Sequence, residues 1–338
     1  MGDNRPDGIN VELDRADHGY GSENRGTSPL HDWRLKAAVQ TLLSHLPRSE
    51  RLNYIIQRHL TRTLPISDEE LVGQVAKAQR NVDAFLRHGS APLAEATFFE
   101  FGVGWDMLMP LVYHSMGVDR QIVVDIKPLA RVDLVEDVAR RLAAAAPRLG
   151  LPRRPFIPHA SGSVMEVAAA LGIEYRAPAD ARALDLPDAS VDMVSSCDVL
   201  EHVPPDDIGA ILIECRRVLR DDGIARMRID YQDHFWYFDA HVSPYNFLRF
   251  DERTWRRFNP ALHYQNRLRH DSVRQLVIEA GWEIIEEEAH EPTPADLRLI
   301  ASMTLAEPFR SAPHNRLAIR FANMTMAKAT SPGRRSAR

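Results

Sequence analysis

From residue 94 onward, short apolar runs alternate with longer stretches whose apolar residues recur at helical spacing. That alternation is typical of a parallel sheet whose strands are joined by crossover helices. Strands are predicted at residues 96–101, 121–124, 173–176, 191–196, 224–229, 282–287 and 317–326. Helices are predicted between them at residues 107–116, 132–144, 163–171, 206–219 and 270–280. The pattern indicates the α/β class, with a mostly parallel seven-stranded sheet.

Helical periodicity also precedes the first predicted strand. Apolar residues recur at helical spacing in residues 32–46 and 49–60, and the run Ser67-Asp68-Glu69-Glu70 is a capping box that begins a third helix. One apolar stripe of that helix consists of Leu71, Val75, Ala78, Val82 and Phe85. The three helices could cover the sheet edge, form a lid, or join two copies as a homodimer.

These patterns divide the chain into regions. Residues 1–30 and 329–338 lack periodicity and are predicted to be disordered tails. Residues 31–93 form a helical extension or lid, and residues 94–328 form one α/β domain. Within it, residues 231–269 break the alternation and are rich in aromatic and polar side chains, which predicts an insertion.

Composition narrows the class of protein. The chain has 338 residues and a formal charge of -5, from 47 acidic and 42 basic side chains that are interspersed. Such a balance favours neither nucleic acid nor a membrane surface as a partner. Cys197 and Cys215 are too few for a disulfide framework or a thiolate metal site, so we expect a reducing, cytoplasmic setting. No apolar run reaches the roughly 18 residues of a membrane-spanning helix.

The stretch from Phe98 to Asp106 predicts a ligand site. It combines a buried strand with a glycine turn and a following helix, which is where α/β sheets bind nucleotide-like ligands. The acidic Glu100 does not suit a phosphate, which prefers backbone amides free of nearby anions. A nicotinamide fingerprint would also need glycine where Met107 stands. The turn therefore favours a ligand with cationic groups or hydroxyls.

Several motifs occur in the order of one known family. They are Glu100-Phe-Gly-Val-Gly104, the acid Asp125, the segment Asp180–Asp192, and Asp198-Val-Leu-Glu-His202 followed by Arg217-Val-Leu-Arg-Asp-Asp-Gly223. Together they resemble the class I S-adenosylmethionine-dependent methyltransferases, in particular a methyltransferase type 11-like domain. The resemblance covers residues 94–288. It implies a Rossmann-like three-layer sandwich and S-adenosyl-L-methionine as the cofactor.

The resemblance assigns roles to the residues of these motifs. Gly102 and Gly104 would let the backbone approach the methionine part of the cofactor, and Glu100 would favour its cationic groups. Asp125 would accept both ribose hydroxyls. The remaining predicted cofactor residues are Asp180 for the adenine amino group, Ala181 through its backbone amide, and Asp198.

Each of these acids also has a plainer interpretation. Glu100 and Asp125 could be solvated charges at strand ends, and Asp180 could belong to an ordinary polar turn. Asp106 stands where the family has a third glycine, which puts a role for that glycine in doubt.

A second set of polar residues follows the strand at 191–196. Asp198, Glu201 and His202 resemble the metal-binding Glu-x-x-Glu-His of plant small-RNA methyltransferases, which also use a later histidine; His234 and His241 are candidates. Such a set could hold Mg²⁺ or Mn²⁺, which would acidify and orient a substrate hydroxyl. We favour the alternative, in which no metal is bound and His202 is a pocket residue or a base.

The insertion supplies the candidates for acceptor recognition. His234 and Asp233 directly follow a predicted strand, so we expect one of them to act as general base. The predicted substrate-binding residues are His241, Tyr245, Asn246 and Arg249. Aromatic rings mixed with polar groups suit a saccharide or another small hydroxylated acceptor.

The predicted function is therefore methyl transfer from S-adenosylmethionine to an oxygen of a small polar acceptor. One rival is a nucleotide-sugar or NAD-dependent enzyme on the same layout, against which Glu100 and Met107 argue. The other is a catalytically silent cofactor-binding module that acts within a complex.

Overall fold

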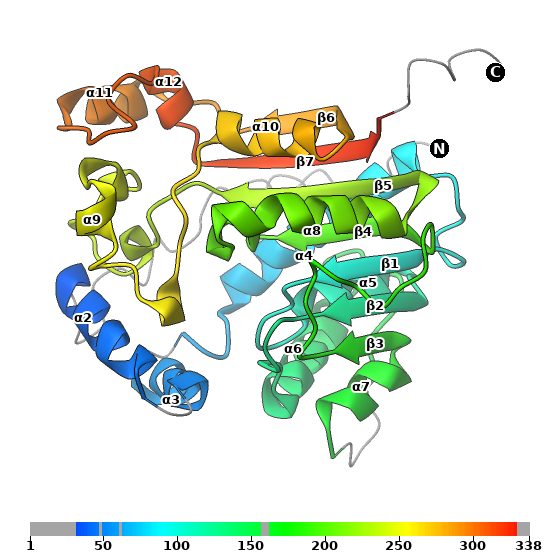
Figure 1. Ribbon diagram of the computed structural model, residues 1–338. Helices are drawn as coiled ribbons and strands as arrows, with labels where there is room; N and C mark the ends of the chain where they lie inside the picture. The colour runs from blue at the N-terminus through cyan, green and yellow to red at the C-terminus, as the bar shows by residue number, and fades with distance from the viewer. Residues whose placement is uncertain (1–31, 47–48, 61–62, 157–161, 330–338) are drawn as a thin grey trace.

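The computed structural model describes residues 32–46, 49–60, 63–156 and 162–329. The predicted tail at 1–30 lies outside these residues, as does the predicted tail at 329–338 except for Ala329. Its centre is a seven-stranded sheet in the order β3-β2-β1-β4-β5-β7-β6 (Figure 1). The strands are β1 (Thr97–Phe101), β2 (Arg120–Val124), β3 (Ile173–Arg176), β4 (Val191–Cys197), β5 (Leu219–Asp230), β6 (Trp282–Ala289) and β7 (Phe321–Lys328). Strands β1 to β5 pair in parallel, and β7 runs antiparallel to β5 and β6. The predicted Rossmann-like, mostly parallel sheet is confirmed.

Helices and helical turns surround the sheet. They are α2 (Trp33–Ser44), α3 (Ser49–Ile55), η1 (Ile56–Leu60), α4 (Asp68–His88), α5 (Leu108–Met116), α6 (Val132–Ala145), α7 (Val164–Ala170), η2 (Leu200–His202), α8 (Pro205–Val218), η3 (His234–Tyr237), η4 (Asn246–Arg249), α9 (Glu252–Trp255), η5 (Ala261–His263), α10 (His270–Glu279), α11 (Pro294–Ser302) and α12 (His314–Leu317). Within the described residues, no helix is long and apolar enough to cross a membrane.

Strand β1 shows why the domain has three layers. Successive side chains of a strand point to opposite faces, so Phe98 packs with α4, α5 and α6 while Phe99 and Phe101 pack with α8 and α10. Strand β1 is buried on both faces, which explains its nearly continuous apolar run.

The N-terminal extension does not cover a sheet edge. Ser67 caps α4 by accepting a hydrogen bond from the Glu70 amide, as the capping box predicts. The apolar stripe of α4 then packs against α5 and the face of the sheet, with Phe85 edge-on to Phe98 at a ring-centroid distance of 5.0 Å. Helix α4 is therefore part of the main domain.

Helix α2 belongs to a separate apolar cluster that includes the insertion. Its Trp33 ring lies 5.3 Å from Phe235, 5.7 Å from Phe250 and 4.8 Å from Phe258. Figure 1 shows α2, α3 and α9 together on one side of the sheet, beyond the carboxyl ends of the parallel strands. The extension and the insertion thus flank the same end of the sheet, where α/β folds bind ligands.

Several boundaries differ from the predictions. Strand β5 begins at Leu219 rather than residue 224, so Asp222 and Gly223 lie inside it, where the pairing with β4 shifts register between Val191 and Met193. The last strand begins at Phe321 rather than residue 317, because α12 occupies the preceding residues. Helix α11 was not predicted, although Thr293 and Asp296 form a capping box around Pro294.

A matched pair of substitutions on α4 tests this packing. Phe85→Ala removes a ring that is 1 % exposed, and we expect it to lower the free energy of unfolding by about 3–5 kcal/mol. Leu86→Ala, next along the helix and 59 % exposed, should change it by no more than about 0.5 kcal/mol. Denaturant unfolding measures both. Equal losses would show that α4 does not pack on the sheet as described.

Candidate active site

The glycine turn after β1 leaves open space beside its backbone. Gly102 has φ +81°, and a Cβ there would lie 2.5 Å from a methyl carbon of Val199. Gly104 has φ +66°, and a Cβ there would meet no atom within 4 Å among the described residues. Both positions require a left-handed backbone that favours glycine. The first glycine permits close packing against the loop after β4, and the second borders free space.

Glu100 lies at the base of this turn and is only 3 % exposed. Its Oε2 atom has no hydrogen-bond partner in any other described residue. Burial raises the pKa of this carboxyl to about 8, because a desolvated anion is unfavourable. A cationic ligand beside Glu100 would reverse that preference.

Asp125 follows β2 and faces the same turn. Its carboxylate accepts hydrogen bonds from the amides of Gly104, at 3.3 Å, and Lys127, at 3.1 Å. Burial raises the pKa of Asp125, while those two amides oppose the rise. The structure thus brings Glu100, Gly104 and Asp125 together, as a cofactor site there requires.

Asp180 is more exposed and already paired. Its carboxylate accepts hydrogen bonds from the Arg182 guanidinium, which lowers its pKa, and Arg182 also bonds Asp207. Ala181, predicted to offer its amide, is half-buried beside it. A ligand that used the Asp180 carboxylate would have to share it with Arg182.

Asp106, which replaces the family's third glycine, has a structural explanation. Its carboxylate accepts a hydrogen bond from the Leu108 amide at 3.2 Å, at the first residue of α5. The intervening Met107 has φ 54°, so α5 begins one residue later than predicted. Asp106 thus satisfies the first amide of α5, although Met107 is the N-cap residue.

Asp198, directly after β4, is held between two cations. Its carboxylate lies 2.7 Å from Lys77 of α4 and also pairs with Arg228 of β5. Burial alone would raise the pKa of Asp198, but Arg228 and Lys77 together hold it below its usual range. Asp198 is therefore ionised and engaged by both cations, and no sequence pattern predicted either partner.

Three polar side chains converge at the ends of β4 and β5. Glu201, His202 and His234 each offer one possible ligand atom, and these three atoms all lie within 4.8 Å of one another. The His202 and His234 rings meet edge to face, with centroids 4.9 Å apart. Asp198, expected in this group, is absent from it because of its two ion pairs, and His234 joins it from the insertion.

Glu201 is the most constrained member of this group. It is 2 % exposed, and neither carboxylate oxygen has a hydrogen-bond partner in any other described residue. Burial, with Asp198 and Asp230 nearby, raises its pKa well above the usual range. An unpartnered buried carboxylate is costly, which is typical of a functional site.

The two histidines are oriented by their surroundings. His202 Nδ1 lies 2.8 Å from the Tyr264 carbonyl oxygen, which can only accept, so the proton is on Nδ1 and Nε2 carries the lone pair. The His202 side chain is partly exposed. Desolvation by the surrounding protein nevertheless lowers the pKa of His202 to about 4, and the nearby His234 lowers it further. His202 is therefore neutral near pH 7.

The remaining predicted catalytic and substrate residues separate into two sets. Asp233 is 0 % exposed and accepts hydrogen bonds from the Phe235 amide and from Asn246, so it braces the insertion. Tyr245 is also 0 % exposed, and its hydroxyl bonds Asp296 and the Ala318 carbonyl. These side chains support the loop from inside. His241 and Arg249 are exposed.

Two further residues of this region were not predicted. Asp230 ends β5, and its Oδ2 lies 3.3 Å from His234 Nε2 while it also accepts from Tyr237 and Gln232. His263 of η5 lies with its ring centroid 6.0 Å from that of His234. The aromatic and polar composition of the insertion was the only signal for them.

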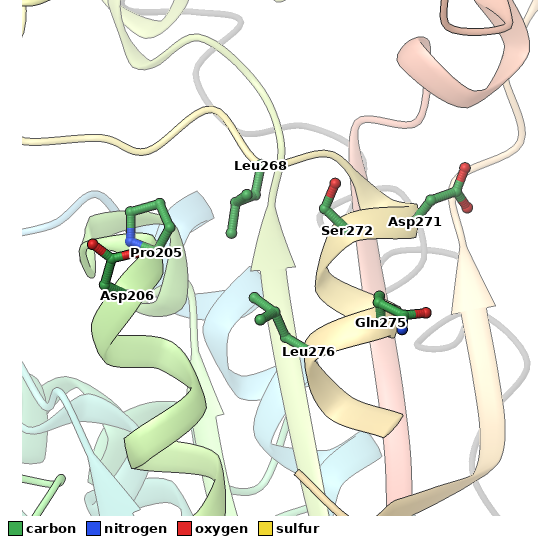
Figure 2. A pocket seen from close by; sticks show the side chains of 7 residues that line it. All are labelled: Pro205, Asp206, Leu268, Asp271, Ser272, Gln275 and Leu276. Atoms are coloured by element: carbon green, nitrogen blue, oxygen red, sulfur yellow. The ribbon is translucent and has the colours of Figure 1, made fainter. Parts of the chain in front are cut away.

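A groove lies apart from these residues, between α8 and α10 (Figure 2). It has a volume of about 490 Å³ and is lined by Pro205, Asp206, Leu268, Asp271, Ser272, Gln275 and Leu276. None of the motif residues lines it. We assign the site to the strand ends instead, where the polar groups converge.

A family model matches part of the chain. Residues 158–227 match the family model described as a methyltransferase domain, a segment that includes β3, β4, η2 and α8. No curated protein matches the chain.

Similar solved structures include PH0226 protein from Pyrococcus horikoshii OT3, with 12% identity and TM-score 0.45 over 80% of this chain and 97% of that one. Another is an S-adenosylmethionine-dependent methyltransferase from Mesorhizobium loti, with 14% identity and TM-score 0.39 over 72% and 98%. A third is Burkholderia thailandensis 1,6-didemethyltoxoflavin-N1-methyltransferase, with 14% identity and TM-score 0.42 over 90% and 94%. At these values the similarities say nothing about the reaction of this chain.

The strand order and the glycine turn agree with the resemblance to the class I S-adenosylmethionine-dependent methyltransferases, and residues 158–227 match a methyltransferase domain. The residues present fit the cofactor of that class. The buried Glu100 suits its cationic methionine part, the open space beside Gly104 admits it, and Asp125 offers acceptors for ribose hydroxyls.

The pKa of Glu100 gives a testable pH dependence. If a cationic cofactor binds the ionised carboxylate, affinity for S-adenosylmethionine should rise with pH towards about 8 and level off above it. Glu100→Gln should remove this dependence and weaken binding by about 10–100-fold, since hydrogen bonds to charged groups are worth roughly 1.5–3 kcal/mol. Calorimetry across this pH range measures both.

Glu174→Gln is the matched control, because Glu174 is exposed on β3. It should retain the affinity and pH profile of the unmodified chain. A Glu100→Gln variant that binds equally well, or whose affinity still rises towards pH 8, would contradict the assignment of Glu100 to the cofactor.

Proposed function

We propose that this chain transfers the methyl group of S-adenosylmethionine to an oxygen of a sugar or another small polar acceptor. The observation that carries the proposal is the convergence of Glu201, His202 and His234 at the ends of β4 and β5. Strand β4 is the neighbour of β1 in the sheet, so this group and the glycine turn share one end of the domain.

The composition of the insertion supports a hydroxylated acceptor. Trp236, Tyr237 and Phe238 are partly exposed beside His234 and offer faces against which the C–H groups of a sugar could stack. His241 and Arg249 are exposed on the same insertion and could bond hydroxyls or an anionic substituent. A small ligand with mixed faces suits such a surface.

In the proposed reaction, the chain mainly aligns the reactants. S-adenosylmethionine supplies a methyl group on a sulfonium: the acceptor oxygen forms the new C–O bond, the S–CH₃ bond breaks, and sulfur keeps the electron pair as a neutral thioether. The acceptor hydroxyl loses its proton to solvent through the polar group at the ends of β4 and β5. Glu100 would orient the cofactor by its methionine part and Asp125 by its ribose.

The acceptor can be identified by labelling. Purified protein and S-adenosylmethionine carrying an isotopic methyl label, incubated with a fractionated extract of polar metabolites, should give a labelled O-methyl ether. A label found only on nitrogen would contradict oxygen transfer. Tight cofactor binding with no labelled product would favour a silent cofactor-binding module, and tight NAD binding without S-adenosylmethionine binding would favour the nucleotide-dependent rival.

We further propose that α2 and α3 act as a lid over this end of the sheet. The Tyr54 ring of α3 lies 5.5 Å from that of Trp105 in the glycine turn, and its hydroxyl donates to Asp133 at 2.8 Å. Glu50 of the same helix pairs with Lys127, two residues after Asp125. The role of these helices in a homodimer stays a prediction.

Removing the Tyr54 contact tests the lid. Tyr54→Ala loses an aromatic pair worth roughly 0.5–1.5 kcal/mol and a hydrogen bond of roughly 0.5–1.5 kcal/mol. We expect dissociation of S-adenosylhomocysteine to become about tenfold faster by stopped-flow measurement. Leu42→Ala, on α2 with the leucine 68 % exposed, is the control and should leave the rate unchanged. An unchanged rate in Tyr54→Ala would mean that α3 does not close the site.

A further inference from the structure

We propose that Glu201, His202 and His234 bind one divalent transition-metal ion. This inference rests on the proposed function for its consequence, because the ion would hold the acceptor oxygen, but the binding itself can be tested without any acceptor. The three candidate ligand atoms lie within 4.8 Å of one another. They come from η2 and η3, which follow the neighbouring parallel strands β4 and β5.

The strongest observation is the state of Glu201. Both of its oxygens are buried and have no hydrogen-bond partner in any other described residue. A carboxylate in this position needs a compensating positive charge or a donor. Arg228, which acts on Glu201 electrostatically, is itself paired with Asp198. A bound cation would compensate Glu201 directly.

The histidines are arranged as metal ligands are. Metal-binding imidazoles commonly donate one ring N–H to a carbonyl or carboxylate, which fixes the orientation of the other nitrogen. The contact of His202 Nδ1 with the Tyr264 carbonyl does this and leaves Nε2 free to coordinate. His234 Nε2 is buried and has no aligned hydrogen bond in the described part of the chain, although Asp230 Oδ2 lies 3.3 Å away.

An ion pair without any metal would leave Glu201 unexplained. A protonated His234 could pair with Asp230 across that 3.3 Å distance. Glu201 would then still lack a partner.

The ligand set narrows the type of ion. Two imidazoles and one carboxylate suit Mn²⁺, Fe²⁺, Co²⁺, Ni²⁺ or Zn²⁺ better than Mg²⁺ or Ca²⁺, which prefer oxygen ligands alone. Three protein ligands also leave coordination positions open. An acceptor hydroxyl in one of them would be acidified and oriented towards the methyl group. This set differs from the predicted Asp198-Glu201-His202, since Asp198 is bound to its two cations.

Metal binding by the full chain tests the proposal. After chelator treatment and dialysis, the protein should bind one equivalent of Mn²⁺, measured by electron paramagnetic resonance of the free ion. It should also bind one equivalent of Co²⁺, with visible absorption bands that report nitrogen ligands. Glu201→Gln, His202→Asn and His234→Asn should each weaken binding by about 100-fold or more, beyond the 10–100-fold typical of residues that only orient a ligand.

His241→Asn is the matched control, because His241 is an exposed histidine of the same insertion. It should leave the Mn²⁺ and Co²⁺ titrations unchanged. If His234→Asn does not fold, Glu201→Gln still decides the matter, since it replaces the carboxylate by an amide of similar shape. No stoichiometric ion in the unmodified chain, or equal binding in Glu201→Gln, would overturn the proposal.

A cross-comparison separates this proposal from the proposed function. Glu201→Gln should lose the ion but retain S-adenosylhomocysteine, and Glu100→Gln should weaken the cofactor but retain the ion. A bound ion in a chain that transfers no methyl group would uphold the metal site and refute the proposed function. Methyl transfer at full rate in chelated protein would overturn the role of the ion in holding the acceptor.

Discussion

The buried ion pairs of Asp198 with Lys77 and Arg228 are the interaction on which the candidate site depends. They join the N-terminal helix α4, the end of β4 and the middle of the sheet at β5. Breaking such a pair by removing one partner typically costs about 3–5 kcal/mol, because a buried charge is left uncompensated. Asp198 also adopts φ 56°, a left-handed conformation that turns the chain sharply after β4. The positions of Glu201 and His202 follow from that turn.

This arrangement ties the helical extension to the proposed active site. Lys77 comes from α4, and Tyr54 of α3 contacts the glycine turn. Helix α2 meanwhile packs Trp33 into the insertion that carries His234. The extension thus touches both the proposed cofactor region and the proposed acceptor region. Changes in its packing should affect binding at each of them.

The sequence predicted the sheet and the cofactor motifs because their signals are local. A buried strand, a glycine turn and a helix lie within about twenty residues of one another, so periodicity and residue type locate them. The strand acids Glu100 and Asp125 reached the same turn for that reason. Helix α11 had a local signal too, in Thr293 and Asp296.

The acceptor side could not be predicted in the same way. Tyr245 was expected to face a ligand, but its hydroxyl is satisfied by Asp296, 51 residues further along the chain. Lys77 pairs with Asp198 across 121 residues, and no local pattern reports such a contact. The choice between His234 and His241 likewise depended on the path of the insertion. Polar residues in a loop can brace it or bind a ligand, and only their partners distinguish the two.

The central claim is that the cofactor turn and the Glu201, His202 and His234 group form one active site. Anomalous diffraction from crystals grown with Mn²⁺ and S-adenosylhomocysteine tests it most directly. We predict one manganese peak bounded by these three side chains, with the cofactor in the glycine turn and its sulfur atom facing the ion. Manganese bound elsewhere, or a cofactor bound in the groove between α8 and α10, would contradict the account.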